Sequence, residues 1–488
     1  MGTTALAGDR RIAAGADAAV PLCVDLDGTL VRSDLLLESV MRLARARPLA
    51  LLRVPLWLAR GGKARLKHEI ARRVDLAGLK LPYDEEVLEF VRAERARRRT
   101  VLVTGSHRSI AEAVAADTDA FDEVRGTDRA TNLTGERKRA WLVERFGRGG
   151  FDYIGNDRDD LAVWPAAREA LAVSRPGGIA SSPGQTFARV FERPRPGARE
   201  LASMLRVHHW SKNLLVFVPW VLDHRLGDPA SLATAALAFL AISLLASATY
   251  ILNDLLDLEA DRRNATKSRR VFASGRVPIA TGVAVGVALV GLAALICLAL
   301  PAGFAAALGL YLVGTLAYSF ALKARAIVDV LTIAALHTLR VVAGTFAIGA
   351  PFTFWPLAFS MFFFLSLALA KRVAELGNLE RAGIASAMSR GYLVADKPFL
   401  VSMGTATGFV SVLVIALYAD SERGNEMYAQ PEALWLVCPV LMYWIGRIWL
   451  LTTRGRMHED PLVFAARDRA SWAVAGAFAL VLGWALLS

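Results

Sequence analysis

The stretch "SATYILNDLLDLEADRRNATKSRR", residues 247–270, passes from apolar to strongly charged within a few residues. An apolar run, residues 232–252, leads directly into four polar groups: Asn253, Asp254, Asp257 and Asp261. The run is long enough to cross a bilayer, and carboxylates in or beside lipid are costly to keep. Arginines and lysines crowd the residues that follow. The stretch therefore predicts a membrane helix that ends in acids in need of a counter-charge.

Apolar runs of similar length recur through the second half of the chain. Of the 488 residues 55% are hydrophobic, yet up to about residue 210 charged residues occur every few positions. Beyond that point the apolar runs are roughly 17–22 residues long, which is the length of a membrane span. We expect nine spans, at 212–224, 232–252, 279–298, 302–322, 326–349, 354–370, 397–418, 432–452 and 468–487. The second half is thus predicted to be an all-α bundle of nine transmembrane helices.

The loops between these spans alternate in charge. Four of them are rich in arginine and lysine: 253–278, the turn near 323, 371–396 and 453–467. The opposite loops contain two basic residues in all, Arg225 and Arg423. The positive-inside rule places the basic loops on the cytoplasmic side of the cell membrane. Residues 1–20 lack the apolar segment of a signal peptide, so the N-terminal half is expected in the cytoplasm as well.

The acids of the first stretch indicate a site for metal and phosphate. Asn253, Asp257 and Asp261 are four residues apart, so on a helix they share one face. Salt bridges to neighbouring arginines would relieve their repulsion, but a divalent cation does so more directly. Mg²⁺ binds one or two carboxylates and completes its shell with substrate phosphate oxygens. Because Lys267 and Arg270 follow closely and can hold further phosphate charge, we favour a Mg²⁺–diphosphate site.

A second polar cluster lies at another basic turn. The stretch "AYSFALKARAIVDV", 317–330, contains Tyr318, Lys323 and Asp329. A lysine at a membrane edge is often only a snorkelling anchor, whereas an aspartate inside a span needs a partner. Lys323 and Asp329 lie six residues apart across the turn, so both can face one cavity. We therefore expect this cluster to share a site with the acids of the first stretch.

The pattern Asn253-Asp254-x-x-Asp257-x-x-x-Asp261 resembles the first aspartate motif of the UbiA superfamily of intramembrane prenyltransferases, and the resemblance covers about residues 200–488. It implies a nine-helix bundle in which these four residues hold Mg²⁺ and a diphosphate at the cytoplasmic mouth. The second motif of that superfamily is normally a pair of acids four residues apart, but here Asp329 stands without the other acid. This departure speaks against an aromatic-acceptor prenyltransferase, which remains one alternative. A transporter that binds ions without turnover is another.

Five further stretches resemble the decaprenyl-phosphate phosphoribosyltransferase branch of that superfamily: "VHHWSKNLLVFVP" (207–219), "YSFALKARAIVD" (318–329), "LALAKRVAEL" (367–376), "RGY" (390–392) and "HEDPLVFAARDRAS" (458–471). The resemblance implies that polyprenyl phosphate attacks C1 of phosphoribosyl diphosphate and releases pyrophosphate. It also implies that three acids are catalytic, namely Asp257, Asp261 and Asp329. The phosphates would be held by Lys212, Asn213, Lys267, Arg270, Lys323, Lys371 and Arg372. The ribose would be oriented by Tyr318, Asp329, Glu375 and Tyr392.

The N-terminal half contains a different set of acids. The stretch "LCVDLDGTLVRSD", 22–34, is an apolar strand that ends in Asp25 and Asp27. Acids two residues apart at a strand end point to the same side, so one can attack phosphorus while the other protonates the leaving oxygen. Three stretches follow in order: "RTVLVTGSH" (99–107) with the hydroxyl of Thr104, "TNLTGERKRAWL" (131–142) with the cation of Lys138, and "FDYIGNDRDDLAVW" (151–164) with several acids. The series indicates a phosphate-handling site.

This order of motifs resembles the haloacid dehalogenase (HAD) superfamily over about residues 20–175, which implies a doubly wound α/β domain and a Mg²⁺ phosphatase. By that likeness Asp25 is the nucleophile, Asp27 the acid/base, and Thr104 and Lys138 hold phosphate. The candidate metal ligands are Asp25, Asp27, Asp157 and Asp160. The last motif departs from the usual Gly-Asp, because it reads Gly155-Asn156. We expect this domain to remove the 5-phosphate from the transferase product, with an inactive docking module as the alternative.

The sequence divides into four parts. They are a flexible N-terminus at 1–19, the HAD-like domain at 20–175 with a helical cap at about 30–98, a linker rich in Pro, Gly and Ser at 176–200, and the transmembrane domain at 201–488. The basic, apolar segment 47–67 is expected to be a cap helix, with a helix resting on the membrane as the alternative. A net charge of +12 suits the lipid bilayer and two anionic substrates, and we expect no nucleic-acid partner. Whether the chain forms a homo-oligomer is left open by the sequence.

Overall fold

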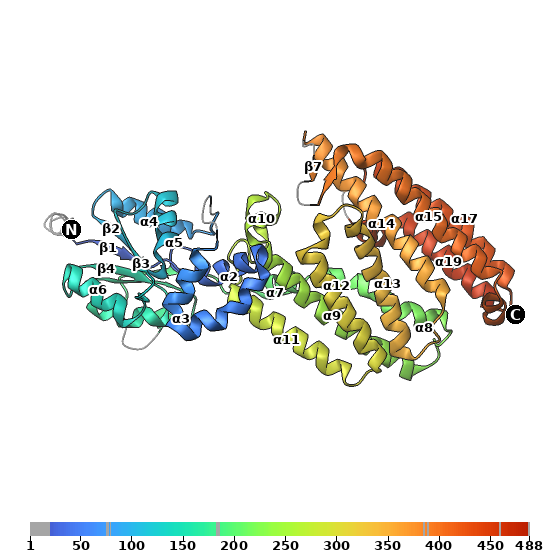
Figure 1. The fold of residues 1–488 in the computed structure, drawn as a ribbon, viewed down its shortest axis with the longest axis horizontal. Coiled ribbons are helices and arrows are strands. Elements are labelled where there is room, and N and C mark those ends of the chain that lie inside the picture. Colours follow the sequence, from blue (N-terminus) through green and yellow to red (C-terminus); the bar gives the residue numbers. More distant parts are fainter. Residues whose placement is uncertain are drawn as a thin grey trace, which may run out of the picture. The chain divides into compact units, whose positions relative to one another are not determined.

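The computed structural model describes residues 20–74, 78, 80–181, 186–383, 386–387, 390–457 and 460–486. The expected flexible N-terminus, 1–19, lies outside them. The chain (Figure 1) divides into two compact units: Met1–Leu205 with Tyr250–Gly286, and Arg206–Thr249 with Val287–Ser488. The loop that contains the first aspartate motif thus belongs to the same unit as the N-terminal half.

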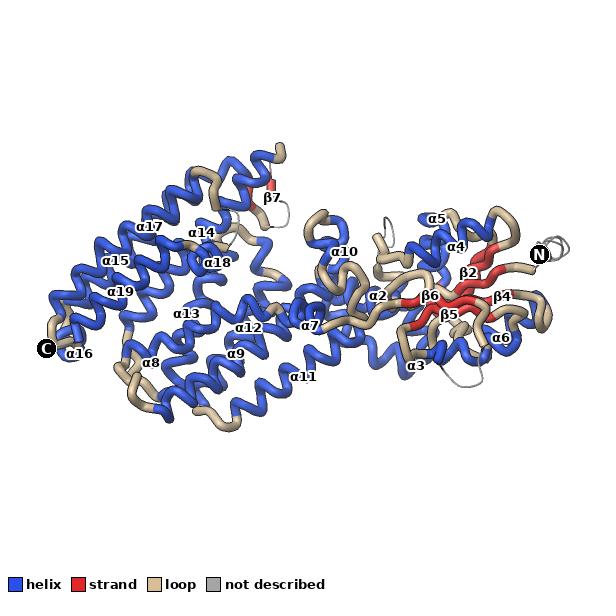
Figure 2. The backbone as a smooth tube through the Cα atoms, turned by 180° about the vertical axis from the view of Figure 1, so that it is seen from behind, coloured by secondary structure: helices blue, strands red, loops and turns tan. Residues whose placement is uncertain are grey.

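The first unit is built around a six-stranded parallel sheet, whose strands are drawn in red in Figure 2. The strand order is β3-β2-β1-β4-β5-β6. Its strands are β1 (Leu22–Val24), β2 (Thr100–His107), β3 (Glu123–Thr127), β4 (Asp152–Gly155), β5 (Ala170–Ser174) and β6 (Arg189–Glu192). The two central strands, β1 and β4, are buried throughout, as in a parallel sheet covered on both faces. The order reverses between them, and ligands of such sheets bind at the carboxyl ends of the strands at this point. The expected doubly wound α/β fold is confirmed.

Helices cover both faces of the sheet. On one face α4 (Glu85–Arg95) and α5 (Arg108–Thr118) pack against Leu22 and Val24. On the other face α6 (Glu136–Phe146) packs in the cluster that contains Cys23. Successive side chains of a strand point to opposite faces, so the three residues of β1 contribute to two separate cores.

Between β1 and β2 the chain forms a helical cap. It consists of α2 (Leu35–Ala46), the 3₁₀ turn η1 (Pro48–Arg53) and α3 (Val54–Ala71). The expected single helix over 47–67 is broken twice, because η1 precedes α3 and because the backbone leaves helical geometry at Gly61 and Gly62. The cap is also shorter than the expected 30–98, since α4 belongs to the core of the sheet.

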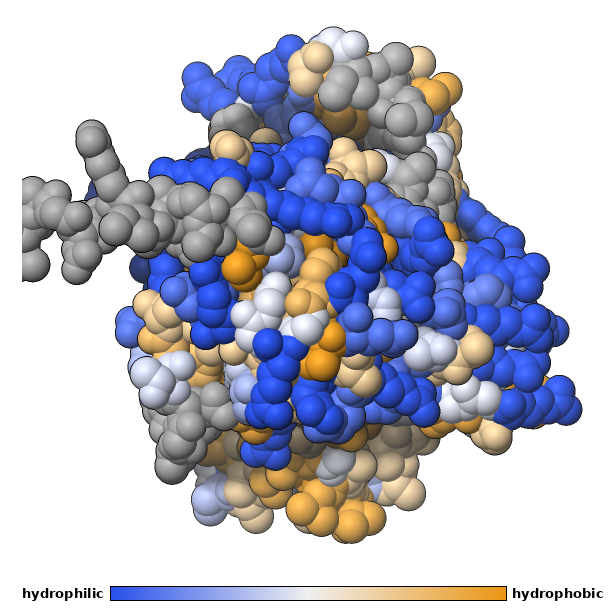
Figure 3. Space-filling model, turned by 90° about the vertical axis from the view of Figure 1, so that its left-hand side faces the viewer, coloured by the Kyte–Doolittle hydropathy of each residue, from blue (hydrophilic) through white to orange (hydrophobic). Residues whose placement is uncertain are grey.

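Eight helices of the described chain are long and apolar enough to cross a membrane. They are α9 (Pro229–Leu256), α11 (Ile279–Cys297), α12 (Ala302–Phe320), α13 (Val328–Ile348), α14 (Phe354–Arg381), α15 (Lys397–Ala419), α17 (Val437–Thr453) and α19 (Arg469–Leu486). Many apolar side chains of α11 and α19 are exposed, as expected for helices that face lipid. By contrast, the face shown in Figure 3, which is the left-hand side of the view in Figure 1, is largely hydrophilic. The chain is a multi-pass membrane protein.

The segment expected as the first span, 212–224, differs from a single helix. The 3₁₀ helix η5 (Val207–Phe217) passes into the short α8 (Val218–Leu222), in which Pro219 stands in the first turn. Both elements run along α13: the carbonyl of Val216 lies against Gly344, and Arg225 donates to the carbonyl of Ile348 at 2.9 Å. Eleven residues at about 2.0 Å and five at about 1.5 Å give roughly 30 Å. The segment is therefore long enough for a ninth crossing, although it is not a regular α-helix.

Candidate functional sites

The proposed nucleophile lies just beyond β1, at the carboxyl edge of the sheet. Asp25 is 6% exposed, and its Oδ1 accepts a hydrogen bond from Lys138 Nζ at 2.8 Å. Lys138 comes from α6 and also donates to the hydroxyl of Tyr153 at 2.8 Å and to Asp160 at 3.1 Å. Burial raises the pKa of Asp25 above its ordinary value, although the charge of Lys138 opposes the shift. Asp25 and Lys138, both expected at this site, therefore lie in contact, and their roles as nucleophile and phosphate holder stay predictions.

The proposed acid/base, Asp27, is held by three donors. Its Oδ1 accepts from the backbone N–H of Leu35 at 2.7 Å. Its Oδ2 accepts from the hydroxyls of Ser106 at 2.6 Å and Thr104 at 3.2 Å. Burial, together with the charge of Asp34, raises the pKa of Asp27 despite these donors. Thr104, expected to hold phosphate, thus orients Asp27 in this structure.

Asp160 has no lone pair left for a metal. Its Oδ1 accepts from Lys138 and from the Tyr153 hydroxyl at 2.6 Å. Its Oδ2 accepts from the backbone N–H groups of Asn156 at 2.9 Å and Asp157 at 3.1 Å. These four bonds use the four acceptor positions of a carboxylate. Asp160 therefore positions Lys138, and Asp157 is the acid of this pair that lines the adjacent pocket.

Asn156 stands where an acid is usual. Its amide oxygen accepts from the Thr29 hydroxyl at 2.8 Å, and the same hydroxyl lies 3.5 Å from Asp25 Oδ2. A Cβ on Gly28, whose φ is +73°, would lie 2.2 Å from the Asn156 amide nitrogen, so this turn requires glycine. The carboxylate of Asp25 and the amide of Asn156 are oxygen donors of the kind that Mg²⁺ accepts. No group of three or more acids, histidines or cysteines gathers as a metal site anywhere in the described chain, so substrate oxygens would have to complete the shell.

The first aspartate motif spans a helix break. α9 ends at Leu256, and Asp257 is the N-cap of α10 (Leu258–Arg263). The helical hydrogen bonds nevertheless continue: the N–H of Asp257 donates to the carbonyl of Asn253 at 2.9 Å, and that of Asp261 to the carbonyl of Asp257 at 2.8 Å. The expected alignment of these three residues on one face is consistent with this bonding.

Arg270 supplies the counter-charge of this motif. Its Nη1 lies 3.1 Å from a carboxylate oxygen of Asp254 and 2.6 Å from one of Asp261. Both acids are almost fully buried, at 5% and 3% exposure. The ion pairs with Arg270 therefore compensate part of their charge. Arg270 was expected to hold phosphate and is the group that a metal would have to displace.

The loop after this motif is docked on the cap. Arg262 forms a two-pronged ion pair with Glu38 of α2, with N–O distances of 2.6 and 2.9 Å. Both side chains are buried, at 5% and 3% exposure. Further along, Gly275 has φ +70°, and a Cβ there would lie 2.7 Å from the Cβ of Arg32. A loop of the transmembrane sequence and the HAD-like domain thus form one folded unit.

Five of the expected ribose and phosphate ligands meet in the second unit. Asp329, fully buried on α13, accepts from Arg372 Nε of α14 at 2.7 Å and from the hydroxyl of Tyr392. Arg372 also donates to Glu375, while its Nη2 is buried with no hydrogen-bond partner among the described residues. Tyr318 joins through Arg390, whose Nη1 lies 3.4 Å from its hydroxyl. The second acid of this cluster is Glu375, which lies on α14, whereas Asp329 lies on α13. In the second motif of the UbiA superfamily the two acids are four residues apart, so they would share one helix.

A second charged group lies beside this cluster on α14. Lys371 and Lys212 both donate to Asp460, at 3.0 and 2.7 Å. Burial alone would raise the pKa of Asp460, but the two ammonium groups hold it well below its ordinary value. One carboxylate therefore serves two cations.

The remaining expected ligands lie elsewhere. Asn213 is buried, where it donates to Ser243 at 3.0 Å and accepts from Arg340 at 2.8 Å, so it joins helices rather than facing an open site. Lys323 lies in the turn η7 (Leu322–Ala324). Lys267 is exposed at the start of η6 (Lys267–Arg269). Since the first aspartate motif and the Asp329 cluster belong to different units, their shared site stays a prediction.

Several residues at these sites were not predicted from the sequence. Ser106 follows Thr104 by two positions on β2, so the alternation of a strand could have marked it. Lys67 of α3 donates to Asn132 at 2.8 Å beside the phosphatase-like site, and nothing in its sequence neighbourhood indicates this. Asp460 and Arg390 lie in the stretches 458–471 and 390–392, which resemble the phosphoribosyltransferase branch, but neither residue is among the predicted ligands.

Two family models match the chain, one in each half. The UbiA prenyltransferase family matches residues 214–467, and the haloacid dehalogenase-like hydrolase family matches residues 22–162. An uncharacterized protein of Sinorhizobium fredii, y4nM, is 38% identical over 96% of this chain and 92% of its own length. Nodulation protein NoeC of Azorhizobium caulinodans is 32% identical over 54% of this chain and 86% of its own length.

More distant relatives include an enzyme and a solved structure. Decaprenyl-phosphate phosphoribosyltransferase of Mycobacterium tuberculosis is 29% identical over 58% of this chain and 92% of its own length. A UbiA homolog from Archaeoglobus fulgidus, solved with GPP and Mg²⁺, aligns with 59% of this chain and 98% of its own at 16% identity and a TM-score of 0.45. The chain belongs to the UbiA prenyltransferase family and has a haloacid dehalogenase-like domain at its N-terminal end.

Proposed function

We propose that the chain transfers the 5-phosphoribosyl group of phosphoribosyl diphosphate to polyprenyl phosphate and then removes the 5-phosphate from the product. In the first step an oxygen of the lipid phosphate bonds to C1 of the ribose while the bond from C1 to the diphosphate breaks. Pyrophosphate leaves. In the second step water splits the phosphomonoester, and inorganic phosphate leaves. The relatives that are decaprenyl-phosphate phosphoribosyltransferases support the first step.

The observation that supports this function most strongly is the surplus of phosphate-binding donors around Lys371 and Arg372. Lys371 shares the single carboxylate of Asp460 with a second lysine. Arg372 leaves Nη2 buried without a partner among the described residues. A buried donor without a partner costs about 1–3 kcal/mol, which an anionic oxygen would recover. Two adjacent donor groups suit a reaction in which both substrates contain phosphate.

The first aspartate motif is the proposed diphosphate site. Mg²⁺ bound there would offset the charge that develops on the departing pyrophosphate. Asp254, Asp257 and Asp261, with Asn253, are oxygen donors suited to it. Arg270 would release Asp254 and Asp261 and become free to pair with a phosphate through two parallel N–H bonds. Asp329 and Glu375 hold Arg372 in place from two sides.

The HAD-like domain has the groups needed for a phosphatase. An oxygen of Asp25 would bond to phosphorus while the bond from phosphorus to the ribose oxygen breaks, and Asp27 would give that oxygen its proton. The raised pKa of Asp27 suits a proton donor. Lys138 keeps Asp25 oriented. Water then hydrolyses the aspartyl phosphate and restores Asp25.

Both sites would face the cytoplasm, because the basic loops that accompany them follow the positive-inside rule. A multi-pass protein in the cell membrane would then bind a water-soluble donor and a lipid acceptor from the same side. Cysteine labelling of the loops 253–278 and 419–431 in intact cells would test this orientation.

The transferase step is tested with ribose-labelled phosphoribosyl diphosphate and polyprenyl phosphate in vesicles that contain the full chain. We expect a labelled lipid and one pyrophosphate per lipid formed. Arg372→Ala should lower the rate by about 100-fold or more, because it removes charge-assisted bonds to phosphate. Arg447→Ala is the matched control, since it breaks a comparable ion pair with Asp468 outside the cluster. A labelled product from prenyl diphosphate, and none from phosphoribosyl diphosphate, would contradict the proposal.

A further inference from the structure

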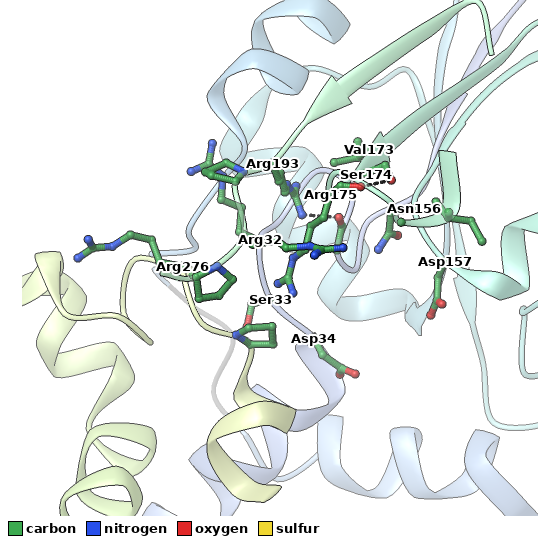
Figure 4. A pocket seen from close by; sticks show the side chains of 18 of the residues that line it. Arg32, Ser33, Asp34, Asn156, Asp157, Val173, Ser174, Arg175, Arg193 and Arg276 are labelled. Atoms are coloured by element: carbon green, nitrogen blue, oxygen red, sulfur yellow. Dashed lines mark hydrogen bonds between the residues drawn. The ribbon is translucent and has the colours of Figure 1, made fainter. Parts of the chain in front are cut away.

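A pocket of about 480 Å³ adjoins the phosphatase-like site, and the proposed hydrolysis uses only part of it (Figure 4). Three groups of residues line it. The catalytic end contains Asp27, Asn156 and Asp157. Four arginines, Arg32, Arg175, Arg193 and Arg195, come from the turn after β1 and from the segments after β5 and β6. The loop after the first aspartate motif adds Gly275, Arg276 and Pro278.

Two of these arginines share one acid. Arg193 lies 2.7 Å from a carboxylate oxygen of Asp84, and Arg32 lies 3.2 Å from the same oxygen. Arg193 also donates to the backbone carbonyls of Gly28 and Thr29 at 2.6 and 2.7 Å, beside the nucleophile turn. Asp84 thus contacts both guanidinium groups, while the carboxylates of Asp34 and Glu200 also line the pocket.

Arg175 adds a third guanidinium group. Its side chain is exposed and has no ion pair or hydrogen bond with any residue that the structure describes. Burial lowers the pKa of Arg193, and the nearby charges of Arg32 and Arg175 lower it further. Three guanidinium groups in one pocket repel one another, and the carboxylates of Asp34 and Glu200 in its lining offset part of this charge. This end of the pocket therefore offers several guanidinium donors to a phosphate.

The loop of the transmembrane sequence completes the wall. Gly275 packs its backbone against Arg32, where any Cβ would collide at 2.7 Å. In Figure 4 the side chain of Arg276 extends from this loop away from Asn156 and Asp157, so we leave it out of the phosphate-binding group. The position of Arg32 at the pocket thus depends on a segment that follows the diphosphate motif.

We propose that Arg32, Arg175 and Arg193 bind a second phosphate of the substrate while its phosphomonoester lies at Asp25. The inference rests on the proposed function and narrows it: the preferred substrate class is a sugar phosphate that also has a phosphate on its other end, as in phosphoribose joined to a lipid phosphate. The pocket volume lies within the range of small-ligand sites, which suits a phosphorylated sugar with the lipid chain outside. A sugar monophosphate leaves the arginine end unoccupied.

Measuring the affinity for sugar phosphates tests the second phosphate site without relying on turnover. The full chain with Asp25→Asn, in detergent, is titrated calorimetrically with ribose 1,5-bisphosphate and with ribose 5-phosphate. We expect the bisphosphate to bind about 10-fold more tightly, since two charge-assisted contacts are gained. Arg32→Ala and Arg175→Ala in this background should lower bisphosphate affinity to that of the monophosphate and leave the monophosphate within about twofold. Arg139→Ala, an exposed arginine paired with Glu136 outside the pocket, should change neither.

Equal affinities for the two sugars, or a preference that survives both substitutions, would overturn the inference. Phosphate release by the unaltered chain separates this result from the proposed function. Release from both sugars with no effect of Arg175→Ala would keep the phosphatase and reject the second phosphate site. An arginine-dependent preference without any phosphate release would keep the site and reject the phosphatase step.

Discussion

Asn156 brings a neutral amide oxygen to a position beside Asp25 where a second carboxylate would bind a divalent ion more strongly. Asn156→Asp should therefore lower the Mg²⁺ concentration needed for half-maximal phosphate release by roughly 3- to 10-fold. Titration of Mg²⁺ against release from a small phosphomonoester measures it. Asp159→Asn, an exposed acid three residues away, is the control. An unchanged or higher Mg²⁺ requirement in Asn156→Asp would show that Asn156 takes no part in metal binding.

At the scale of residues, the sequence predicted the groups that recur in ordered motifs. Asp25 pairs with Lys138, and Asp27, two residues further along, binds hydroxyls of β2, as the order of the motifs along the chain indicated. The roles of Thr104 and Asp160 were less predictable, because a hydroxyl or a carboxylate near phosphate chemistry can bind the ligand or orient a neighbour. The hydrogen-bond partners decide between these two roles. Tyr153 of β4, the partner of Asp160, has no distinguishing pattern in the sequence.

Among the elements, the contact between α2 and α10 joins the HAD-like domain to the loop after the aspartate motif. Arg262→Ala would leave Glu38 buried without its partner, which costs about 3–5 kcal/mol. We expect faster hydrogen exchange in peptides from α2 and from residues 258–276, measured by mass spectrometry on the full chain. Arg263→Ala is the matched control, because its pair with Glu259 is exposed and such pairs contribute about 0–1 kcal/mol. Equal exchange in both variants would contradict the docked loop.

The start of β4 provides a pH-dependent contact. Burial raises the pKa of Asp152, but hydrogen bonds from Arg168 and Arg98 more than offset this and lower it. A lowered pKa in the folded chain means that the stabilisation is present above about pH 4, the ordinary value, and is lost as the pH falls further. Exchange of the peptide 149–156, corrected for intrinsic rates, should therefore be constant from pH 7 to 5 and rise below about pH 4.

Asp152→Asn removes the titrating group while keeping the shape of the side chain. It should speed exchange of the same peptide at pH 7 by an amount that corresponds to about 3 kcal/mol, because two arginines lose their partner, and it should abolish the rise in acid. Glu112→Gln, whose pair with Arg108 is exposed, should reproduce neither effect. If the exchange rate of this peptide still rose in acid in Asp152→Asn, a titrating group other than Asp152 would be responsible.

The elements themselves were predictable to different degrees. Apolar length identified the eight regular spans, because crossing a bilayer demands it. It could not predict that 207–222 forms a 3₁₀ helix and a short α-helix, since that depends on close approach to Gly344 of α13. The cap was overestimated for a related reason: the apolar side of α4 packs on the sheet, and helical periodicity does not say which neighbour a helix has.

For the whole molecule, the sequence predicted two domains and their families but not how the chain groups into compact units. Charged residues are common on surfaces, so nothing about Arg262 and Glu38 marks them as a buried pair between segments more than 200 residues apart. The grouping has a functional consequence. A single loop contains the proposed diphosphate ligands at one end and a wall of the phosphatase pocket at the other.

A doubly labelled donor follows both proposed steps, phosphoribosyl transfer and removal of the 5-phosphate, in one experiment. Phosphoribosyl diphosphate with ¹⁴C in the ribose and ³²P in the 5-phosphate is incubated with polyprenyl phosphate and the full chain in vesicles. With Asp25→Asn, we expect a lipid that contains both labels in equal amounts. With the unaltered chain, the lipid should keep ¹⁴C while ³²P appears as inorganic phosphate. The absence of both labels from the lipid in either protein would contradict phosphoribosyl transfer, and equal retention of both labels by the unaltered chain would contradict the phosphatase step.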